Sequence, residues 1–400
     1  MIYLDNAATT QISPAVLEAM MPYLKDVYAN PGTIYGFGRQ AADAISKARK
    51  QVADFIGAKP EQIIFTSGGT EANNLAIKGC KNHLTKINKK HIVTSPTEHD
   101  SVLRAIESLC NPLCCNDKKC VKPEFYTSFL PVDKRGHIQV DELEHMSYTY
   151  DDIGLVSVMY ANNEIGVLNN VASVGRICRE KHILFHTDCV QAAGSVALDV
   201  TKIGCDFMSI SSHKIHGVKG VGALYVRDKQ YLSPIINGGL VQEFGLRGGT
   251  ENVAGIVGFG KACELAGKGT EDYSKMVISY KKHFCEILKD RLADEHMEND
   301  VSINGLLPKY PGKTLSLTFK NVDAETLVLM MGAKGVCISA GSACTSHESN
   351  PSHVLKAIGL SDDEARSTVR ISFSEFNTVY EVERGAKLLA GCVKTLRGII

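Results

Sequence analysis

The chain has 400 residues, of which 44% are hydrophobic and 22% charged, a composition typical of a globular protein with a substantial core. Its 44 basic residues balance 44 acidic residues, so the overall charge favours neither nucleic acid nor an anionic membrane as a partner. The sequence shows no run of eighteen apolar residues and no signal-peptide pattern, and we therefore expect a cytoplasmic protein. In that setting its thirteen cysteines should be reduced, most of them as small buried hydrophobes.

Strands and helices alternate through the first 256 residues. After an extended opening, helices are predicted from residue 13 to about 25 and in a long amphipathic stretch beyond residue 38. The candidate strands are short apolar runs at residues 62–65, 91–94, 154–159, 183–186, 207–211 and 222–226. Helical patterns between most of them predict an α/β fold with a mostly parallel sheet covered by helices on both faces. In such sheets, ligands bind beyond the carboxyl ends of the strands.

The pattern changes after about residue 256. Predicted helices near 255–266, 273–292, 323–331 and 379–396 accompany predicted strands at 314–319, 335–339 and 368–373. These elements predict a smaller α+β domain, made of residues 1–12 and 257–400, beside a large domain of residues 13–256. Residues 340–352 are rich in Gly, Ser, Thr, Asn and Pro, and we expect a mobile loop there.

A lysine with polar neighbours follows the fifth candidate strand. Ser211, Ser212 and His213 directly precede Lys214. An amine desolvated at the end of a buried strand becomes less basic and more nucleophilic, and neighbouring hydroxyl groups suit a phosphate. The alternatives are a Schiff-base lysine and an ordinary turn lysine. Lys219 lies among glycines without adjoining hydroxyls and is the weaker candidate.

Other polar motifs also follow strands. The motif Thr66-Ser-Gly-Gly-Thr-Glu-Ala-Asn-Asn74 opens a helix, so its backbone N–H groups and Thr70 offer an anion site, or simply a capped turn. Asp188 ends another strand and either pairs with a protonated ring nitrogen or caps the next helix. His99 and Asn163 follow two further strands, where a structural role is the alternative for each.

The joint pattern discriminates better than any single motif. An anion cradle, a carboxylate, a histidine, amides and a lysine, each after its own strand, suit a phosphorylated aromatic cofactor held by the lysine. Pyridoxal 5′-phosphate requires a Schiff-base lysine, a carboxylate that keeps the ring nitrogen protonated, and a phosphate cup. The sequence therefore predicts a pyridoxal phosphate site at the carboxyl edge of the sheet.

A second centre lies near the C-terminus. Cys344 falls in the polar loop, where burial cannot be its purpose, and an exposed thiol is a liability unless it is used. A structural or adventitious thiol is the alternative. Arg370 lies in an otherwise apolar strand pattern, where a guanidinium needs a partner, and a substrate carboxylate bound through two hydrogen bonds would provide one.

Together these motifs resemble the NifS/IscS-type cysteine desulfurases, class V members of the aspartate aminotransferase fold type. The resemblance covers nearly the whole chain, from Tyr3-Leu-Asp-Asn-Ala-Ala-Thr-Thr10 to Val369-Arg-Ile-Ser-Phe373. Its most specific motifs are Thr66–Asn74, Asn162-Asn-Glu-Ile-Gly-Val167, Ser212-His-Lys-Ile-His-Gly217 and Gly341-Ser-Ala-Cys-Thr-Ser346. It implies a seven-stranded, mostly parallel sheet with a smaller α+β domain. The last motif is similar to that of the long-loop branch, which serves iron–sulfur cluster assembly.

The resemblance implies a role for each matched residue. Lys214 would carry the Schiff base and shuttle protons, while Cys344 would take sulfur from L-cysteine as a persulfide and leave L-alanine. His99 would stack on the cofactor ring and assist proton transfer. Asp188 would pair with the ring nitrogen of the cofactor, and Gln191 would contact the ring hydroxyl. The phosphate would be bound by Gly69, Thr70, Ser211 and His213. Asn163, which also contacts the cofactor, and Arg370 would bind the substrate carboxylate.

The same resemblance implies partners. Thr250 would reach the phosphate bound by a neighbouring subunit, which makes the active unit a homodimer. The persulfide would pass to an iron–sulfur scaffold or another acceptor protein.

Two features depart from the family pattern. The family's Asn-Pro-Ser-Ser-x-His appears here as Asn30-Pro-Gly-Thr-Ile-Tyr35, so the role of that histidine has no counterpart at Tyr35. Cys110, Cys114, Cys115 and Cys120 fall in a segment that looks like an insertion. Four thiols could bind a metal, but their spacing matches no standard zinc module, and we predict no metal site.

Three hypotheses follow. The chain is a cysteine desulfurase, another lyase or aminotransferase of the same fold such as a selenocysteine lyase, or a non-catalytic assembly protein. A thiol at position 344 favours the first over an aminotransferase, while Lys214 and Asp188 argue against the third.

Overall fold

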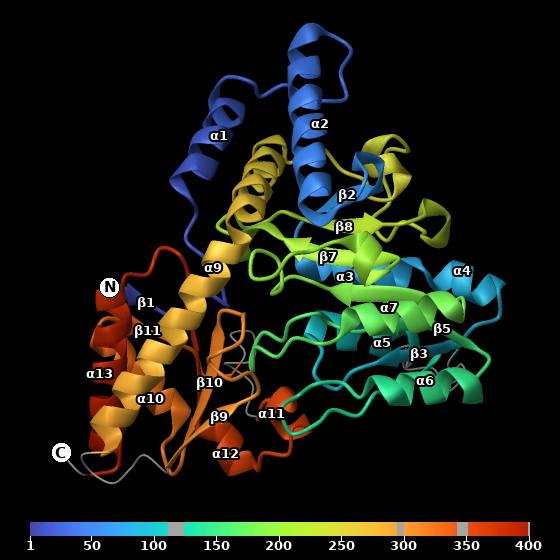
Figure 1. Ribbon diagram of the computed structural model, residues 1–400. Helices are drawn as coiled ribbons and strands as arrows, with labels where there is room; N and C mark the ends of the chain where they lie inside the picture. The colour runs from blue at the N-terminus through green and yellow to red at the C-terminus, as the bar shows by residue number, and fades with distance from the viewer. Residues whose placement is uncertain (111–123, 294–299, 342–350, 399–400) are drawn as a thin grey trace, which may run out of the picture.

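The centre of the molecule is a seven-stranded sheet in the order β2-β8-β7-β6-β5-β3-β4 (Figure 1). The computed structural model describes residues 1–110, 124–293, 300–341 and 351–398. The strands are β2 (Ile63–Thr66), β3 (His91–Thr94), β4 (Tyr126–Phe129), β5 (Ile153–Ser157), β6 (Leu184–Asp188), β7 (Phe207–Ser211) and β8 (Gly222–Val226). Strand β8 pairs antiparallel with β2 and β7, and the other pairs are parallel. The predicted α/β class and mostly parallel sheet are confirmed.

Helices cover both faces of this sheet (Figure 1). The helices in this part of the chain are α1 (Pro14–Lys25), α2 (Gly36–Ile56), α3 (Gly69–Gly79), α4 (Lys81–Lys86), α5 (Asp100–Cys110), α6 (Val140–Thr149), α7 (Val171–Glu180) and α8 (Val200–Ile203), of which α1 packs against α9 (Val253–Ala293) rather than on the sheet. Successive strand residues point to opposite faces, so Ile63 and Phe65 join one hydrophobic core and Ile64 joins the other. Burial on both faces explains why these strands are nearly continuous apolar runs. Edge strand β4 is half exposed and lacks such a run, and it was not predicted.

The C-terminal part of the chain forms a second sheet and a third hydrophobic core. The strands of this sheet, β9 (Val301–Asn304), β10 (Thr314–Phe319) and β12 (Thr368–Ser372), are antiparallel, and β1 (Ile2–Tyr3) pairs separately with β11 (Val336–Cys337). The helices here are α10 (Ala324–Ala333), α11 (His353–Ala357), α12 (Asp362–Arg366) and α13 (Val379–Leu396). The strand predicted at 335–339 is shorter than expected, and β9 was not predicted. The division into domains at residue 256 stays a prediction.

Helix α9 (Val253–Ala293) corrects another expectation. The sequence predicts two helices at 255–266 and 273–292, but the structure has one helix of 41 residues, which includes Gly267 and Gly269 between them. Two glycines weaken a helix by about 1 kcal/mol each, which packing can offset. Helix α9 packs against α1, α2 and α13, and its diagonal course joins the two sheets (Figure 1).

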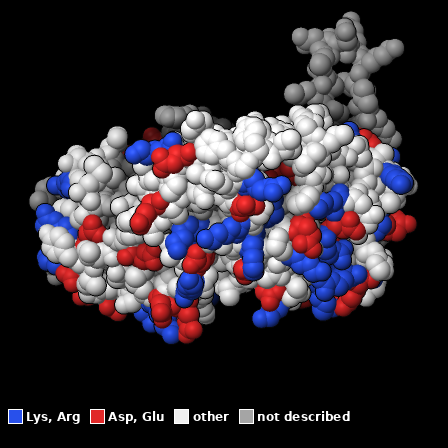
Figure 2. Space-filling model, turned by 90° about the horizontal axis from the view of Figure 1, so that it is seen from above, with Lys and Arg blue, Asp and Glu red and all other residues white. Residues whose placement is uncertain are grey.

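The charge balance of the sequence is visible on the surface. On the face shown in Figure 2, acidic and basic side chains are intermixed, and a broad area beside them has neither. Within the described ranges, no helix combines the length and apolarity needed to cross a bilayer.

Candidate active site

A cavity of about 200 Å³ lies beyond the carboxyl ends of the central strands. That is where the strand-edge rule for α/β sheets places a ligand. The predicted site residues that line it are Gly69, Thr70, His99, Asn163, Asp188, Gln191, Ser211, His213, Lys214 and Arg370. Thr250 is exposed and does not line this cavity, and Cys344 lies outside the described residues.

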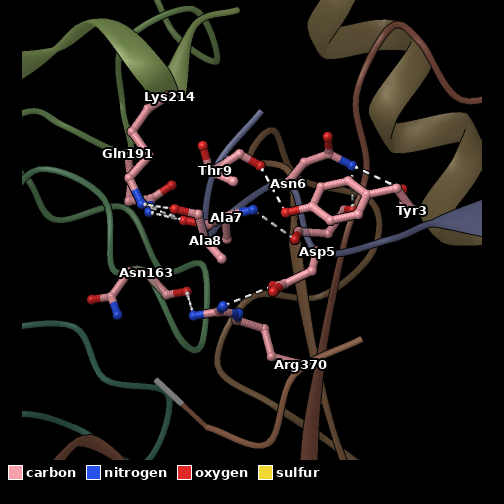
Figure 3. Close-up of polar contacts among 11 residues, drawn as sticks. Tyr3, Asp5, Asn6, Ala7, Ala8, Thr9, Asn163, Gln191, Lys214 and Arg370 are labelled. Carbon is pink, nitrogen blue, oxygen red and sulfur yellow. Dashed lines mark hydrogen bonds and ion pairs between the residues drawn. The ribbon is translucent and has the colours of Figure 1, made fainter. Parts of the chain in front are cut away.

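Lys214 ends the short 3₁₀ turn η2 (Ser212–Lys214) that follows β7. Its Nζ donates hydrogen bonds to the carbonyl oxygens of Ala7 at 2.6 Å and Ala8 at 2.8 Å (Figure 3). The extended N-terminal segment therefore crosses the cavity and supplies acceptors to the lysine. No sequence motif marks this contact, because two alanines offer only their backbone.

A second lysine lies beside the first. The buried Lys313 donates from Nζ to the backbone oxygen of Lys214 at 2.9 Å. Burial, followed by the nearby charges of Lys214 and Arg370, lowers the pKa of Lys313 to about 7. This residue was missed because it stands directly before an apolar strand and belongs to no recognisable motif.

Asp188 is buried at the end of β6. Its Oδ2 accepts from Asn73 Nδ2 at 2.7 Å, and its Oδ1 accepts from the backbone N–H of Val190 at 2.9 Å. The alternative of a helix cap is wrong, because the next helix α8 is capped by Asp199. Both hydrogen bonds to the Asp188 carboxylate come from neutral groups, so they leave its negative charge uncompensated.

Asn73 and Ser101 connect Asp188 to His99. Asn73 Nδ2 also donates to Ser101 Oγ at 2.8 Å, and Ser101 Oγ lies 2.8 Å from His99 Nδ1. Neither residue was predicted. Asn73 was within reach of sequence reasoning, since it lies one helical turn after Gly69 and Thr70, on the face that those residues turn toward the cavity.

The anion cradle predicted near Gly69 has a structural basis. Helix α3 begins at Gly69, and a Cβ built there would lie 2.7 Å from Val190 Cγ2, so only glycine lets the backbone come this close. Ser211 Oγ and Gln191 Oε1 are buried with no hydrogen-bond partner within the described ranges. Unsatisfied buried polar groups are costly, and a polar ligand would satisfy them.

His213 closes the same end of the cavity. Its Nδ1 lies 3.1 Å from Thr9 Oγ1. Burial, followed by the charges of Lys214, Lys313 and Lys219, lowers the pKa of His213 to about 4, so the imidazole is neutral at pH 7. The helix start, the hydroxyl and this imidazole fit the phosphate of a pyridoxal cofactor, while Lys214 and Asp188 fit its aldehyde and its ring nitrogen.

Arg370 enters the cavity from the second sheet. It lies on β12, is 2% exposed, and pairs through Nη2 with Asp5 Oδ1 at 2.9 Å (Figure 3). Its Nη1 donates to the backbone oxygen of Asn163 at 3.2 Å. The sequence predicted a substrate carboxylate as the partner of this guanidinium, whereas in the structure it pairs with the carboxylate of Asp5. A role of Arg370 in binding the substrate stays a prediction.

Two further features bear on the predictions. Glu98 is fully buried and accepts from the backbone N–H of Met159 at 2.8 Å, and burial raises its pKa well above the ordinary value. Among the described residues, no group of three or more His, Cys, Asp or Glu side chains is placed to hold a metal ion. Cys110 is buried at the end of α5, and Cys114, Cys115 and Cys120 lie outside those residues.

Comparison with known proteins shows where this arrangement recurs. The family model described as aminotransferase class-V matches residues 2–384. "Cysteine desulfurase IscS" of Methanosarcina thermophila is 39% identical over 399 residues, which cover 100% of this chain and 93% of the relative. "Cysteine desulfurase" of Homo sapiens is 41% identical over 400 residues, which cover 99% of this chain and 82% of the relative.

Solved structures agree. One described as "NIFS-LIKE PROTEIN" superimposes with a TM-score of 0.84 at 34% identity, covering 99% of this chain and 100% of the other. Another, described as "SspA in complex with cysteine", has a TM-score of 0.77 at 34% identity and covers 94% and 100% of the two chains. The resemblance drawn from the motifs is confirmed. The chain belongs to the class-V aminotransferase family, among the NifS- and IscS-like cysteine desulfurases.

Proposed function

We propose that this chain uses pyridoxal 5′-phosphate, held in the cavity at the carboxyl edge of the sheet, to remove sulfur from L-cysteine. The products are L-alanine and a persulfide on Cys344. One observation carries this proposal most directly: Lys214, Asp188 and Gly69 line a single cavity although they follow different strands. The names of the relatives and the cysteine complex of a similar structure support the substrate.

The residues that would hold the cofactor fall into three groups. Lys214 would hold it covalently, Asp188 would pair with the ring nitrogen, and Gln191 would contact the ring hydroxyl. The phosphate would lie against Gly69, Thr70, Ser211 and His213, while His99 and Asn163 would complete the wall. When bound, pyridoxal phosphate withdraws electrons from the carbon of the amino acid that is attached to it.

The remaining steps belong to the chain itself. The carbonyl oxygens of Ala7 and Ala8 hold the Lys214 amine within the cavity, where Nζ moves protons to and from the substrate. Arg370 and Asn163 orient the substrate carboxylate. The Cys344 thiolate attacks the substrate sulfur, so that a sulfur–sulfur bond forms while the carbon–sulfur bond breaks, and the carbon takes a proton to leave as alanine.

The proposal includes two kinds of protein partner. Thr250 is exposed, which leaves it available to a second copy of the chain, and Ile34, Leu240 and Val241 are 96%, 89% and 92% exposed. Large apolar side chains this exposed favour burial against another protein surface, and we assign them to a homodimer. A sulfur acceptor, such as an iron–sulfur scaffold, would then receive the persulfide.

The test is incubation of the purified protein with L-cysteine and measurement of alanine and of sulfide released by a reductant. The wild type should form both, whereas Cys344→Ala should keep the yellow cofactor but form neither. Lys214→Ala should lose the covalently held chromophore and turnover together. Lys219→Ala is the matched control, since that lysine is exposed in the loop between η2 and β8, and it should behave as wild type. Pyruvate in place of alanine would overturn the proposed reaction.

A further inference from the structure

A directed hydrogen-bond chain links the two ends of the predicted cofactor ring site. It runs from Asp188 through Asn73 and Ser101 to His99, with successive distances of 2.7, 2.8 and 2.8 Å. Asn73 is 1% exposed and Ser101 is 9% exposed, so both side chains are held largely within the protein at the wall of the cavity. The direction of each hydrogen bond can be derived from the chemistry of the groups.

The direction is set at Asp188. A carboxylate oxygen only accepts, so the atom of Asn73 that faces it must be the amide nitrogen, which fixes the orientation of the Asn73 side chain. The two hydrogens of that amide go to Asp188 Oδ2 and to Ser101 Oγ. Because Ser101 Oγ accepts one of them, its own hydrogen is available to His99 Nδ1.

A second donor reaches the same ring nitrogen. The backbone N–H of Ser101 points at His99 Nδ1 over 3.1 Å. A hydrogen on Nδ1 would have to break this bond and also turn the Ser101 hydroxyl away, so the two donors together favour an unprotonated Nδ1. The hydrogen of the neutral imidazole is therefore on Nε2, since the tautomer follows from the hydrogen bonds that the ring makes.

We propose that Asn73 and Ser101 are positioning residues that fix His99 as the neutral Nε2–H tautomer, so that His99 donates a hydrogen bond at the cavity and leaves proton transfer to Lys214. The proposal rests on the proposed function for its consequence in the reaction, but the tautomer itself does not depend on it. If His99 took a proton at Nδ1, the Ser101 hydroxyl hydrogen would have to turn away. The new N–H of the ring would also point at the backbone N–H of Ser101. The chain of donors opposes that change.

The tautomer is measurable by NMR of protein labelled with ¹⁵N-histidine, purified with its cofactor and without substrate at neutral pH. His99→Gln assigns the signals, because the pair that disappears belongs to His99. In the wild type, Nδ1 should show the shift of an unprotonated ring nitrogen and Nε2 that of a protonated one. A protonated Nδ1 would overturn the proposal, whether or not the enzyme desulfurates cysteine.

Variants of Ser101 test the role of the hydroxyl. Ser101→Ala keeps the backbone donor but loses the hydroxyl donor, so the His99 signals should move toward a mixture of tautomers, while Ser101→Thr should restore the wild-type spectrum. Turnover should fall on the order of 10-fold in Ser101→Ala, as when an outer hydrogen-bond partner of a functional histidine is lost, and recover in Ser101→Thr. Ser108→Ala is the control, since Ser108 lies on the same helix and donates to Ala105. Unchanged His99 signals in Ser101→Ala would contradict the assignment.

Discussion

The two edges of the central sheet each bury one aspartate, and they use it differently. Asp188 ends β6 at the carboxyl edge and Asp206 precedes β7 at the amino edge, with exposures of 5% and 3%. Each accepts a backbone N–H, from Val190 at 2.9 Å and from Phe185 at 2.8 Å. Beyond that the two sites diverge, since Asp206 forms an ion pair with Arg227 whereas Asp188 accepts from the neutral amide of Asn73.

The different partners of the two aspartates indicate that the amino edge of the sheet serves stability and the carboxyl edge serves function. Burying a carboxylate is costly unless its charge is balanced, and Arg227 offsets part of that cost at the amino edge, where burial still raises the pKa of Asp206. At the carboxyl edge the hydrogen bonds to Asp188 come from neutral groups, so a cationic ligand that reaches Asp188 does not have to displace an arginine. The amino edge also has a cavity of about 340 Å³ beside Asp206, so a hollow alone does not make a site.

Exchange of each aspartate for asparagine tests this comparison most strongly. Asp188→Asn keeps an oxygen for Asn73 and should fold, but a neutral amide cannot hold a protonated ring nitrogen. We expect kcat to fall about 10²–10⁴-fold, the range for loss of a positioned charge or acid–base group. Asp206→Asn should lower the free energy of unfolding by about 1–3 kcal/mol, since Arg227 is half exposed, and leave kcat per folded molecule unchanged. Equal losses of kcat would break the comparison.

Removal of Arg370 tests the part of the site that comes from the second sheet. Arg370→Gln should lower kcat/KM for L-cysteine by a factor that corresponds to about 2–5 kcal/mol of lost stabilisation, because the substrate carboxylate loses a buried charged partner. The same change leaves Asp5 unpaired, so the protein should also lose stability. In Asp5→Asn/Arg370→Gln the stability should largely return and kcat/KM should not. If both return, the pair is structural and the carboxylate role is wrong.

These two tests also mark what the sequence could predict. Asp188, Lys214 and Gly69 were predictable because each directly follows a strand in a contiguous motif, and parallel strands bring such motifs to one edge. The Asp5–Arg370 pair joins residues 365 positions apart, and only the pairing of Asp5 with Ser372 at the end of β12 brings them together. Lys313 was missed because only the fold brings it to Lys214. The two helices expected within α9 merge because packing on several sides outweighs two glycines.

Lys313 provides a smaller test, which depends on pH. Its pKa falls from the ordinary 10.5 to about 7, chiefly through burial, so the unfolded chain binds this proton more tightly than the folded chain between those values. Stability therefore rises with pH across that interval, and the cost of the buried charge is fully present below about pH 7. In urea unfolding, the free energy of unfolding of Lys313→Met should exceed that of the wild type most strongly below pH 7, and the difference should shrink toward pH 10. Lys320→Met, which removes an exposed lysine just after the other end of β10, should show no such trend. A constant difference across this pH range would contradict the shift.

Glycines at the two edges provide the mildest test. A Cβ on Gly69 would lie 2.7 Å from Val190 Cγ2, and one on Gly154, at the amino end of β5, would lie 2.8 Å from Leu84 Cδ2. Gly69→Ala should weaken cofactor binding by about 1–3 kcal/mol, the usual cost of overpacking, because it pushes the start of α3 away from the phosphate.

The steric cause of that loss can be separated from a general loss of structure. Val190→Ala removes the atom that the new methyl group meets, so Gly69→Ala/Val190→Ala should regain most of the affinity in a pyridoxal phosphate titration followed by absorbance. Gly154→Ala crowds Leu84 and also the backbone oxygen of Lys89, which lies 2.8 Å from the added Cβ, but at the opposite edge, so it should lower stability and leave cofactor affinity intact. If Gly154→Ala weakened cofactor binding as much as Gly69→Ala does, the two edges would not be independent. The loss in Gly69→Ala could then not be attributed to the local geometry of the carboxyl edge.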